Sequence, residues 1–164
     1  MSTKKLQLAG TQDFDPPTML KRQYIINNLQ NTFKQYGFLP IQTPAIEHLE
    51  TLTGKYGEDQ DKLIFKILNS GNFLAKTTLK DYQEGHKTLS KKIAEKALIY
   101  DLTVPLGRYI LEHLHDINFP FKRYQIQPVY RADKPQKNRY KEFFQCDVDI
   151  VGGQSLLYLS LIHI

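Results

Sequence analysis

The chain has 164 residues, 41% of them apolar and 24% charged, a length that suits about one domain and a composition that excludes collagen-like, mucin-like and wholly disordered chains. Its 22 basic and 17 acidic residues give a net charge of +5, which is compatible with a polyanionic partner but does not demonstrate one. One cysteine excludes an intramolecular disulfide, and no apolar run reaches the length of a membrane span, so we expect a cytoplasmic protein with no membrane partner.

The first predicted element is a long helix that begins after Asp15. This residue can cap a helix, and Pro16 and Pro17 are tolerated in a first turn. Gly37 is a typical stop. The residues expected on the buried stripe recur at helical spacing: Met19, Ile26, Leu29, Phe33 and Tyr36.

A strand and a hairpin are predicted next. Pro40 and Pro44 exclude a helix and restrict any strand there to an edge or an interface. Leu63–Leu68 is typical of a strand, residues 69–72 of a turn, and Phe73–Ala75 of the returning strand of a hairpin.

The middle of the chain predicts a polar excursion and then a second helix. Residues 80–96 are mostly charged or polar, which favours a solvated, partly helical segment. Residues 97–102 indicate a short strand, and Thr103 can cap the helix that follows. The expected buried stripe of that helix is Leu106, Ile110, Leu111 and Leu114.

The last two strands are predicted over Tyr124–Tyr130 and Phe143–Val151, joined by a polar loop. Strands paired through hairpins, with helices set apart from them, indicate an antiparallel sheet of the α+β class with flanking helices.

The final strand carries a polar row. Because side chains alternate along a strand, Gln145, Asp147 and Asp149 share one face, and the opposite face, which includes Phe144 and Cys146, is expected to be buried. Two aspartates are unusual on a solvated strand and repel each other unless a cation lies near them. The row is either a wetted face or one that points at a ligand.

The loop before this strand holds five cationic side chains between Arg131 and Lys141. A solvated hairpin tip is one interpretation. Phosphate binding is the other, since Arg131 follows a strand that can hold its planar guanidinium in place, and Arg139 could add a second clamp. Asp101, close to the Thr103 hydroxyl, would suit an α-ammonium group.

The sequence gives little support for a reactive cysteine, a metal site or a glycine-rich phosphate loop. Cys146 falls on the apolar face, where packing is expected rather than reactivity. His113 and His115 are two residues apart on a predicted helix and diverge, so we expect no metal site. The chain has no glycine-rich phosphate loop of the Walker A or GxGxxG type, so any nucleotide would be held by arginines.

Two segments resemble the histidyl-tRNA synthetases, a class II family: YDLTVPLGRY at Tyr100–Tyr109 and KRYQIQPVYRADKPQKNRYKEFFQCDVDIVG at Lys122–Gly152. The earlier GTQDFDPP and YGFLPIQTPAIE are similar to that family's N-terminal segment and motif 1. The resemblance implies a class II antiparallel sheet, truncated here before its last strands. It divides the chain into an irregular N-terminal segment (1–15), a partial catalytic domain (16–152) and an atypical apolar tail (153–164).

The resemblance also implies a reaction: activation of L-histidine by ATP, with Mg²⁺, to histidyl-adenylate, then transfer to histidine tRNA by a homodimer. Arg131 would be the catalytic arginine, bridging the histidine carboxylate and the α-phosphate. The implied histidine-binding residues are Asp101, Leu102, Thr103, Arg131, Gln145 and Asp149, with Asp149 reading the imidazole. The implied ATP-binding residues are Arg131, Asp133 and Arg139, and Pro44 would lie at the dimer interface.

The chain departs from the family pattern at Gln12, Ile99 and Asn138, and in the tail that follows Gly153. It also ends before the family's third motif and its anticodon-binding domain, so we expect this piece alone not to aminoacylate tRNA.

Two other functions remain open. One is the non-catalytic, synthetase-like regulatory partner of ATP phosphoribosyltransferase, a paralogue expected to lose some of the residues kept here. The other is a basic nucleic-acid-binding module that uses the Lys134–Lys141 loop.

Overall fold

The computed structural model describes residues 6–53, 62–134, 136, 139–155 and 157–158. Asn138 and most of the predicted apolar tail lie outside the described residues. Among the helices of the described part, none has the length and apolar character needed to cross a membrane.

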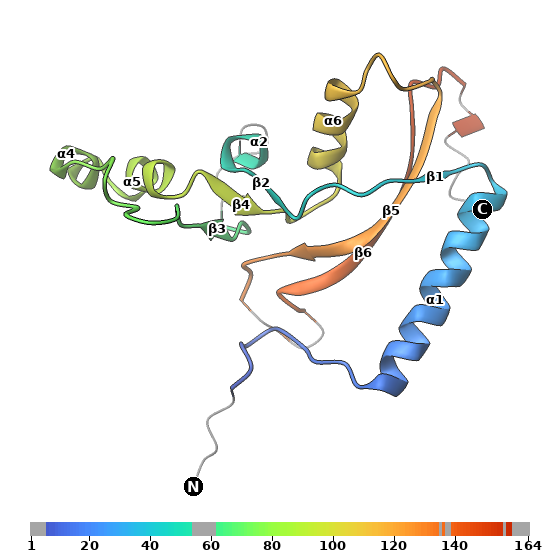
Figure 1. Ribbon diagram of the computed structural model, residues 1–164, viewed down its shortest axis with the longest axis horizontal. Coiled ribbons are helices and arrows are strands. Elements are labelled where there is room, and N and C mark those ends of the chain that lie inside the picture. Colours follow the sequence, from blue (N-terminus) through green and yellow to red (C-terminus); the bar gives the residue numbers. More distant parts are fainter. Residues whose placement is uncertain (1–5, 54–61, 135, 137–138, 156, 159–164) are drawn as a thin grey trace, which may run out of the picture.

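Helix α1 spans Pro16–Gln35 and confirms the predicted long helix. Asp15 caps it by accepting a hydrogen bond from the Thr18 amide at 3.1 Å, and Gly37 follows its end with φ of 76°. The apolar stripe is not fully buried, however, since Met19 and Tyr36, at its two ends, remain 46% and 49% exposed. Figure 1 shows that α1 lies beside the β5–β6 hairpin along one flank, and no other helix or strand of the described part covers its outer side.

The central sheet contains β5 (Phe121–Tyr130) and β6 (Glu142–Val151), an antiparallel pair ten residues long. The short strand β1 (Leu39–Pro40) lies against β5 and gives the order β1-β5-β6. The α+β class and the edge position of Pro40 are confirmed. One pair differs from the antiparallel pattern, since β1 runs parallel to β5.

A second sheet has the order β2-β4-β3, all antiparallel, with β2 at Ile46–His48, β3 at Lys66–Ile67 and β4 at Lys96–Leu98. Helix α2 (Leu49–Thr53) lies beside this sheet, and α4 (Leu79–Gln83) and α5 (His86–Ile93) follow β3 in the chain, with α4 farthest from the sheet (Figure 1). The partly helical excursion over 80–96 is therefore confirmed. In Figure 1 the segment from β3 to β4 projects away from the central sheet as an arm.

The predicted return strand at Phe73–Ala75 is wrong. These residues form turns, and the partner of β3 is β4, some 30 residues further along. Asn69 explains why β3 pairs with β4, because its side chain accepts a hydrogen bond from the Glu95 amide at 3.0 Å and donates one to the Lys92 carbonyl at 3.0 Å. Side-chain bonds across the arm thus fix a non-local pairing that local turn propensity does not reveal.

Helix α6 spans Thr103–Glu112 and confirms the predicted second helix. Its stripe is incompletely buried, since Leu111 is 75% exposed and Leu114 lies beyond the helix end. His113 and His115 also follow the helix rather than lie on it. Two small buried clusters lie near the start of α6: Val104 packs against the first, and Leu102, just before the helix, belongs to the second. The first is Leu49, Leu52, Ile64, Ala97 and Tyr100, and the second is Ile99, Leu102 and Val129.

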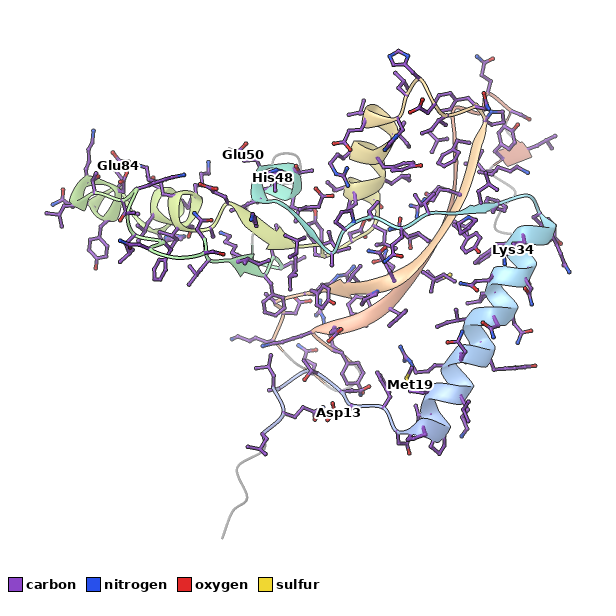
Figure 2. The ribbon with its side chains drawn as sticks, in the orientation of Figure 1. Asp13, Met19, Lys34, His48, Glu50 and Glu84 are labelled. Carbon is purple, nitrogen blue, oxygen red and sulfur yellow. The ribbon has the colours of Figure 1, made fainter. Side chains whose placement is uncertain are left out.

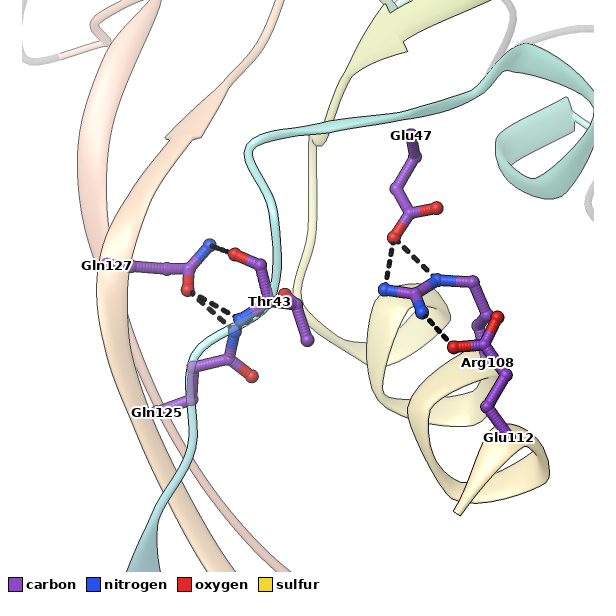
Figure 3. Close-up of polar contacts among 6 residues, drawn as sticks. All are labelled: Thr43, Glu47, Arg108, Glu112, Gln125 and Gln127. Atoms are coloured by element: carbon purple, nitrogen blue, oxygen red, sulfur yellow. Dashed lines mark hydrogen bonds and ion pairs between the residues drawn. The ribbon is translucent and has the colours of Figure 1, made fainter.

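An ion-pair network joins β2 to α6 (Figure 3). Arg108 on α6 places Nε and Nη2 each 2.7 Å from Oε1 of Glu47, whose side chain is only 4% exposed. Its Nη1 donates to Glu112 at 2.6 Å. These charge-assisted bonds hold the first turns of α6 against the strand that follows Pro44.

The arm carries its own acid-sensitive contact. Asp81 accepts from Lys92 at 2.7 Å and from the amide and hydroxyl of Thr78 at 2.7 and 2.8 Å, and these bonds lower the pKa of Asp81 to about 2. Its folded pKa is below its unfolded value, so the stabilisation is present above about pH 4 and lost as the pH falls toward 2.

We expect Asp81→Asn to lower the melting temperature at pH 7 but to have a smaller effect at pH 2.5. Melting curves at both pH values check this, and an equal loss at both would contradict it.

Candidate functional site

The polar face of the β5–β6 hairpin forms the candidate site. The register places Arg123 opposite Asp149, Gln125 opposite Asp147, and Gln127 opposite Gln145. Partners directly across a ladder point to the same side of a sheet, so the predicted common face of the three β6 residues is confirmed. Arg131 continues the alternation of β5 on this side, where its guanidinium lies 5.0 Å from the ring centroid of Phe143.

The expected burial of the opposite face is wrong. Phe144 is 48% exposed and Cys146 is exposed, whereas the polar residues across the strand are half-buried. The reason is that α1 covers only part of this face: Phe33 contacts Tyr124 on β5, whereas Phe144 stays exposed with the Arg22 guanidinium 5.2 Å from its ring centroid.

Arg123 is the most buried polar residue of the site, and the sequence analysis missed it. It has no exposed surface. Its Nη2 forms an ion pair with Asp149 Oδ2 at 2.5 Å, and Nη1 donates to Gln125 at 3.1 Å. Its Nε has no hydrogen-bond partner among the described residues. Burial lowers the pKa of Arg123, and Asp149 opposes this. The group remains a buried cation under the polar row.

Buried amides then fasten the segment before Pro44 to β5 (Figure 3). Gln125 Nε2 donates to the Thr43 hydroxyl at 2.9 Å and to Gln127 Oε1 at 2.8 Å, and Gln127 Nε2 donates to the Thr43 carbonyl at 3.2 Å. The signal for these residues was present in the sequence, since Arg-x-Gln-x-Gln alternates through KRYQIQP, a pattern that places three polar groups on one face of a strand.

Gln145 links the two neighbouring carboxylates. Its Nε2 lies 3.2 Å from Asp101 Oδ2 and 3.1 Å from both oxygens of Asp147. Its Oε1 is buried and accepts no hydrogen bond within the described residues. Carboxylate oxygens and an unused amide oxygen meet here, which is an acceptor set that suits an ammonium group.

The two carboxylates differ in their surroundings. Burial tends to raise the pKa of Asp101, but hydrogen bonds from Thr103 and Gln145 and the nearby Arg131 lower it overall. For Asp147, burial is the largest effect and its pKa is raised. Asp101 is thus the more firmly ionised of the two carboxylates.

The start of α6 is built differently from the prediction. Leu102 occupies the N-cap position without a side-chain capping bond, and Oδ1 of Asp101, one residue earlier, accepts from the Thr103 amide at 2.7 Å. The Thr103 side chain makes no capping bond and is exposed. Leu102 has no exposed surface and packs in the second cluster, so only its main chain could face a ligand.

The cationic candidates lie where β5 ends. Arg131 Nε donates to the Tyr100 carbonyl at 3.1 Å, which orients its guanidinium. Asp133 and Arg139 form an ion pair with each other at 3.0 Å, so these two nucleotide candidates lie together. Pro44 is exposed, beside the buried Thr43. In the described part of the chain, no group of three or more His, Cys, Asp or Glu side chains is arranged to hold a metal ion.

Comparison with known proteins gives a consistent result. The family model described as Histidyl-tRNA synthetase matches residues 10–78. The histidine–tRNA ligase of Cytophaga hutchinsonii is 60% identical over 148 residues, covering 90% of this chain and 33% of that protein. The enzyme of Flavobacterium johnsoniae is 51% identical over 176 residues, with 95% and 37% covered. The chain therefore spans about a third of the length of these relatives.

Solved structures agree. The histidyl-tRNA synthetase from Nostoc sp. PCC 7120 matches with a TM-score of 0.70 at 33% identity, covering 97% of this chain and 32% of that one. An ATP phosphoribosyltransferase regulatory subunit/histidyl-tRNA synthetase from Bacillus halodurans matches with a TM-score of 0.66 at 22% identity, covering 94% and 34%, and shows the fold alone. The resemblance predicted from the motifs is thus confirmed: the chain is a relative of the histidyl-tRNA synthetases and matches about one third of their length.

Proposed function

We propose that this chain carries the amino-acid-binding part of a histidine–tRNA ligase, in which ATP activates L-histidine before transfer to histidine tRNA. One observation supports this above all: Asp101, Asp147 and Gln145 converge on the face of the sheet from which Arg131 also rises. An acceptor set beside a planar cation matches the ammonium and carboxylate of an amino acid.

Each group then has a role. Asp101 and Gln145 would accept hydrogen bonds from the α-ammonium group, with Thr103 and the main chain of Leu102 beside them. Asp149 uses Oδ2 for Arg123, and its other oxygen can accept a hydrogen bond from an imidazole N–H. A substrate that lacks this donor would leave a half-buried carboxylate unsatisfied, which is an effective basis for selectivity.

In the activation step, a carboxylate oxygen of histidine attacks the α-phosphorus of ATP, the P–O bond to the β-phosphate breaks, and pyrophosphate leaves. Arg131 would stabilise the charge that develops on the phosphoryl oxygens. Asp133 and Arg139 would contact the nucleotide, and Mg²⁺ would enter with ATP. Pro44 at a homodimer interface, and a cytoplasmic location where tRNA is charged, belong to the same proposal.

The regulatory paralogue is the second candidate. Its structural neighbour supports the fold only, whereas the relatives at 51–60% identity are ligases. Retention of Arg131 and of the ammonium acceptors also favours the ligase. A regulatory protein should bind histidine, but it gains nothing from the adenylate portion of a non-hydrolysable histidyl-adenylate analogue.

Histidine-dependent exchange of pyrophosphate into ATP tests the whole proposal. We expect the complete gene product to catalyse this exchange and the 164-residue chain not to, while calorimetry shows that the chain binds the adenylate analogue more tightly than histidine. Robust exchange by the short chain would refute the expected inactivity. Equal binding of histidine and the analogue would favour the regulatory paralogue.

A further inference from the structure

Arg123 is a cation buried beneath the polar row of β6. Its side chain has no exposed surface and lies directly across the ladder from Asp149. A guanidinium stays protonated in a folded protein, so burying one has a large desolvation cost. A buried ion pair gains little net stability over apolar side chains of similar size. Stability alone therefore does not account for a charge at this position.

The two ends of this guanidinium are held by different partners. Nη2 forms the ion pair with Oδ2 of Asp149 at 2.5 Å, and Nη1 donates to Gln125 at 3.1 Å. Gln125 is itself fixed, because its Nε2 donates to the Thr43 hydroxyl at 2.9 Å (Figure 3). Gln125 and Thr43 are only 1% and 3% exposed. The guanidinium is thus anchored from behind, and its orientation does not depend on Asp149 alone.

The ion pair also decides which oxygen of Asp149 is left for a ligand. Oδ2 is buried, whereas the side chain as a whole is 39% exposed, so the open surface lies on its other atoms, of which Oδ1 is the polar one. A carboxylate on a short side chain can otherwise rotate and exchange its two oxygens. Because Arg123 holds Oδ2, Oδ1 is the acceptor that remains.

Arg123 also attracts two neighbouring carboxylates. Burial is the largest effect on the pKa of Arg123 and lowers it, whereas Asp149, Asp147 and Asp101 each raise it. The attraction is mutual, so one cation offsets the repulsion among three nearby carboxylates. Arg123 is therefore the cation that two aspartates on one face of β6 require.

We propose that Arg123 is a positioning residue for selection of the amino-acid side chain, because it holds Oδ2 of Asp149 and leaves Oδ1 aimed at a ring N–H of the bound amino acid. The proposal rests on the proposed function for the identity of that amino acid. Arg123 has no exposed surface, so it acts only through Asp149. An acceptor that is held in place before the ligand arrives discriminates better than one that must first be ordered.

The test measures selectivity. Calorimetry on the complete gene product compares L-histidine with β-(2-thienyl)-L-alanine, whose ring is similar in size and has no N–H donor. Arg123→Met keeps an unbranched side chain that can fill the buried space but removes the guanidinium. It should lower the preference for histidine about tenfold, the value of one charge-assisted hydrogen bond, and change binding of the thienyl analogue less than about threefold. Arg123→Lys keeps the charge but cannot hold both Asp149 and Gln125, so it should restore only part of the preference.

Two control variants remove a positive charge elsewhere. Arg108→Met also takes away an arginine that pairs with a buried carboxylate, that of Glu47, but this pair does not involve Asp149. Lys34→Gln removes an exposed charge near the end of α1 (Figure 2). Both controls should retain the preference for histidine within about twofold, because they lie apart from the ion pair.

An unchanged preference in either Arg123 variant would overturn the proposal, so the test holds even if one of them does not fold. Equal weakening of both ligands would also overturn it, since a merely structural role predicts that result. Exchange of pyrophosphate into ATP is measured on the same samples. Histidine-dependent exchange with an unchanged preference would remove the role of Arg123 and leave the proposed function intact. Absence of exchange, with a preference that depends on Arg123, would remove the ligase and leave that role.

Discussion

Replacement of Asp149 by alanine is expected to lower the free energy of unfolding by about 3 kcal/mol, because it removes the carboxylate that pairs directly with the buried guanidinium of Arg123. Arg123 has no exposed surface, and its Nε already lacks a hydrogen-bond partner in the described part of the chain. Asp149 is 39% exposed, so water can partly replace it, which is why we take the lower end of the range for a broken buried pair. Urea denaturation, with an unchanged slope, measures the loss.

A double variant separates the cost of leaving the Arg123 charge buried from the cost of lost packing. Arg123→Met/Asp149→Leu removes both charges and should recover all but about 1 kcal/mol, the remainder reflecting the lost donor to Gln125. Asp116→Ala is the control, since this carboxylate is 79% exposed beside His113 and should cost under about 0.5 kcal/mol. If the double variant is no more stable than Asp149→Ala, the buried charge is not the cause.

The elements that local rules determine were predictable from the sequence. The Asp15 cap with two prolines sets the start of α1, and alternation along Phe143–Val151 sets which residues share a face. These predictions depend on a few neighbouring residues, and tertiary packing did not override them. The same alternation places Gln145 and Asp149 on one face of the strand, as the structure has them.

The failures share a different cause. Phe73–Ala75 lacks its predicted strand because Asn69 bonds to residues at the far side of the arm. The alternation of Arg123 with Gln125 and Gln127 indicates a polar face of β5, but it does not indicate the ion pair across the ladder with Asp149. Burial of Phe144 and Cys146 failed because period-2 patterning shows which face is apolar but not whether another element covers it. Contacts between residues distant in sequence decided all three.

Arg131 is expected to contribute most to ligand binding. Arg131→Ala should weaken binding of the non-hydrolysable histidyl-adenylate analogue about 10- to 100-fold, the value of charge-assisted hydrogen bonds worth about 1.5–3 kcal/mol. Binding of histidine alone should fall less, because it lacks the phosphoryl group that Arg131 would also contact. A general structural defect would weaken both ligands alike, so calorimetry with the two ligands distinguishes contact from misfolding.

The conservative variant sharpens this test. Arg131→Lys keeps the charge but loses the planar fork and the Nε that donates to the Tyr100 carbonyl, so it should recover only part of the affinity. Lys134→Ala, an exposed cation three residues further along the same loop, is the matched control and should alter affinity less than twofold. Full recovery by lysine would mean that any positive charge suffices at this position, and an equal loss in the Lys134 variant would mean that the loop acts only through its overall charge. Either result would contradict a bidentate role for Arg131 in binding the adenylate.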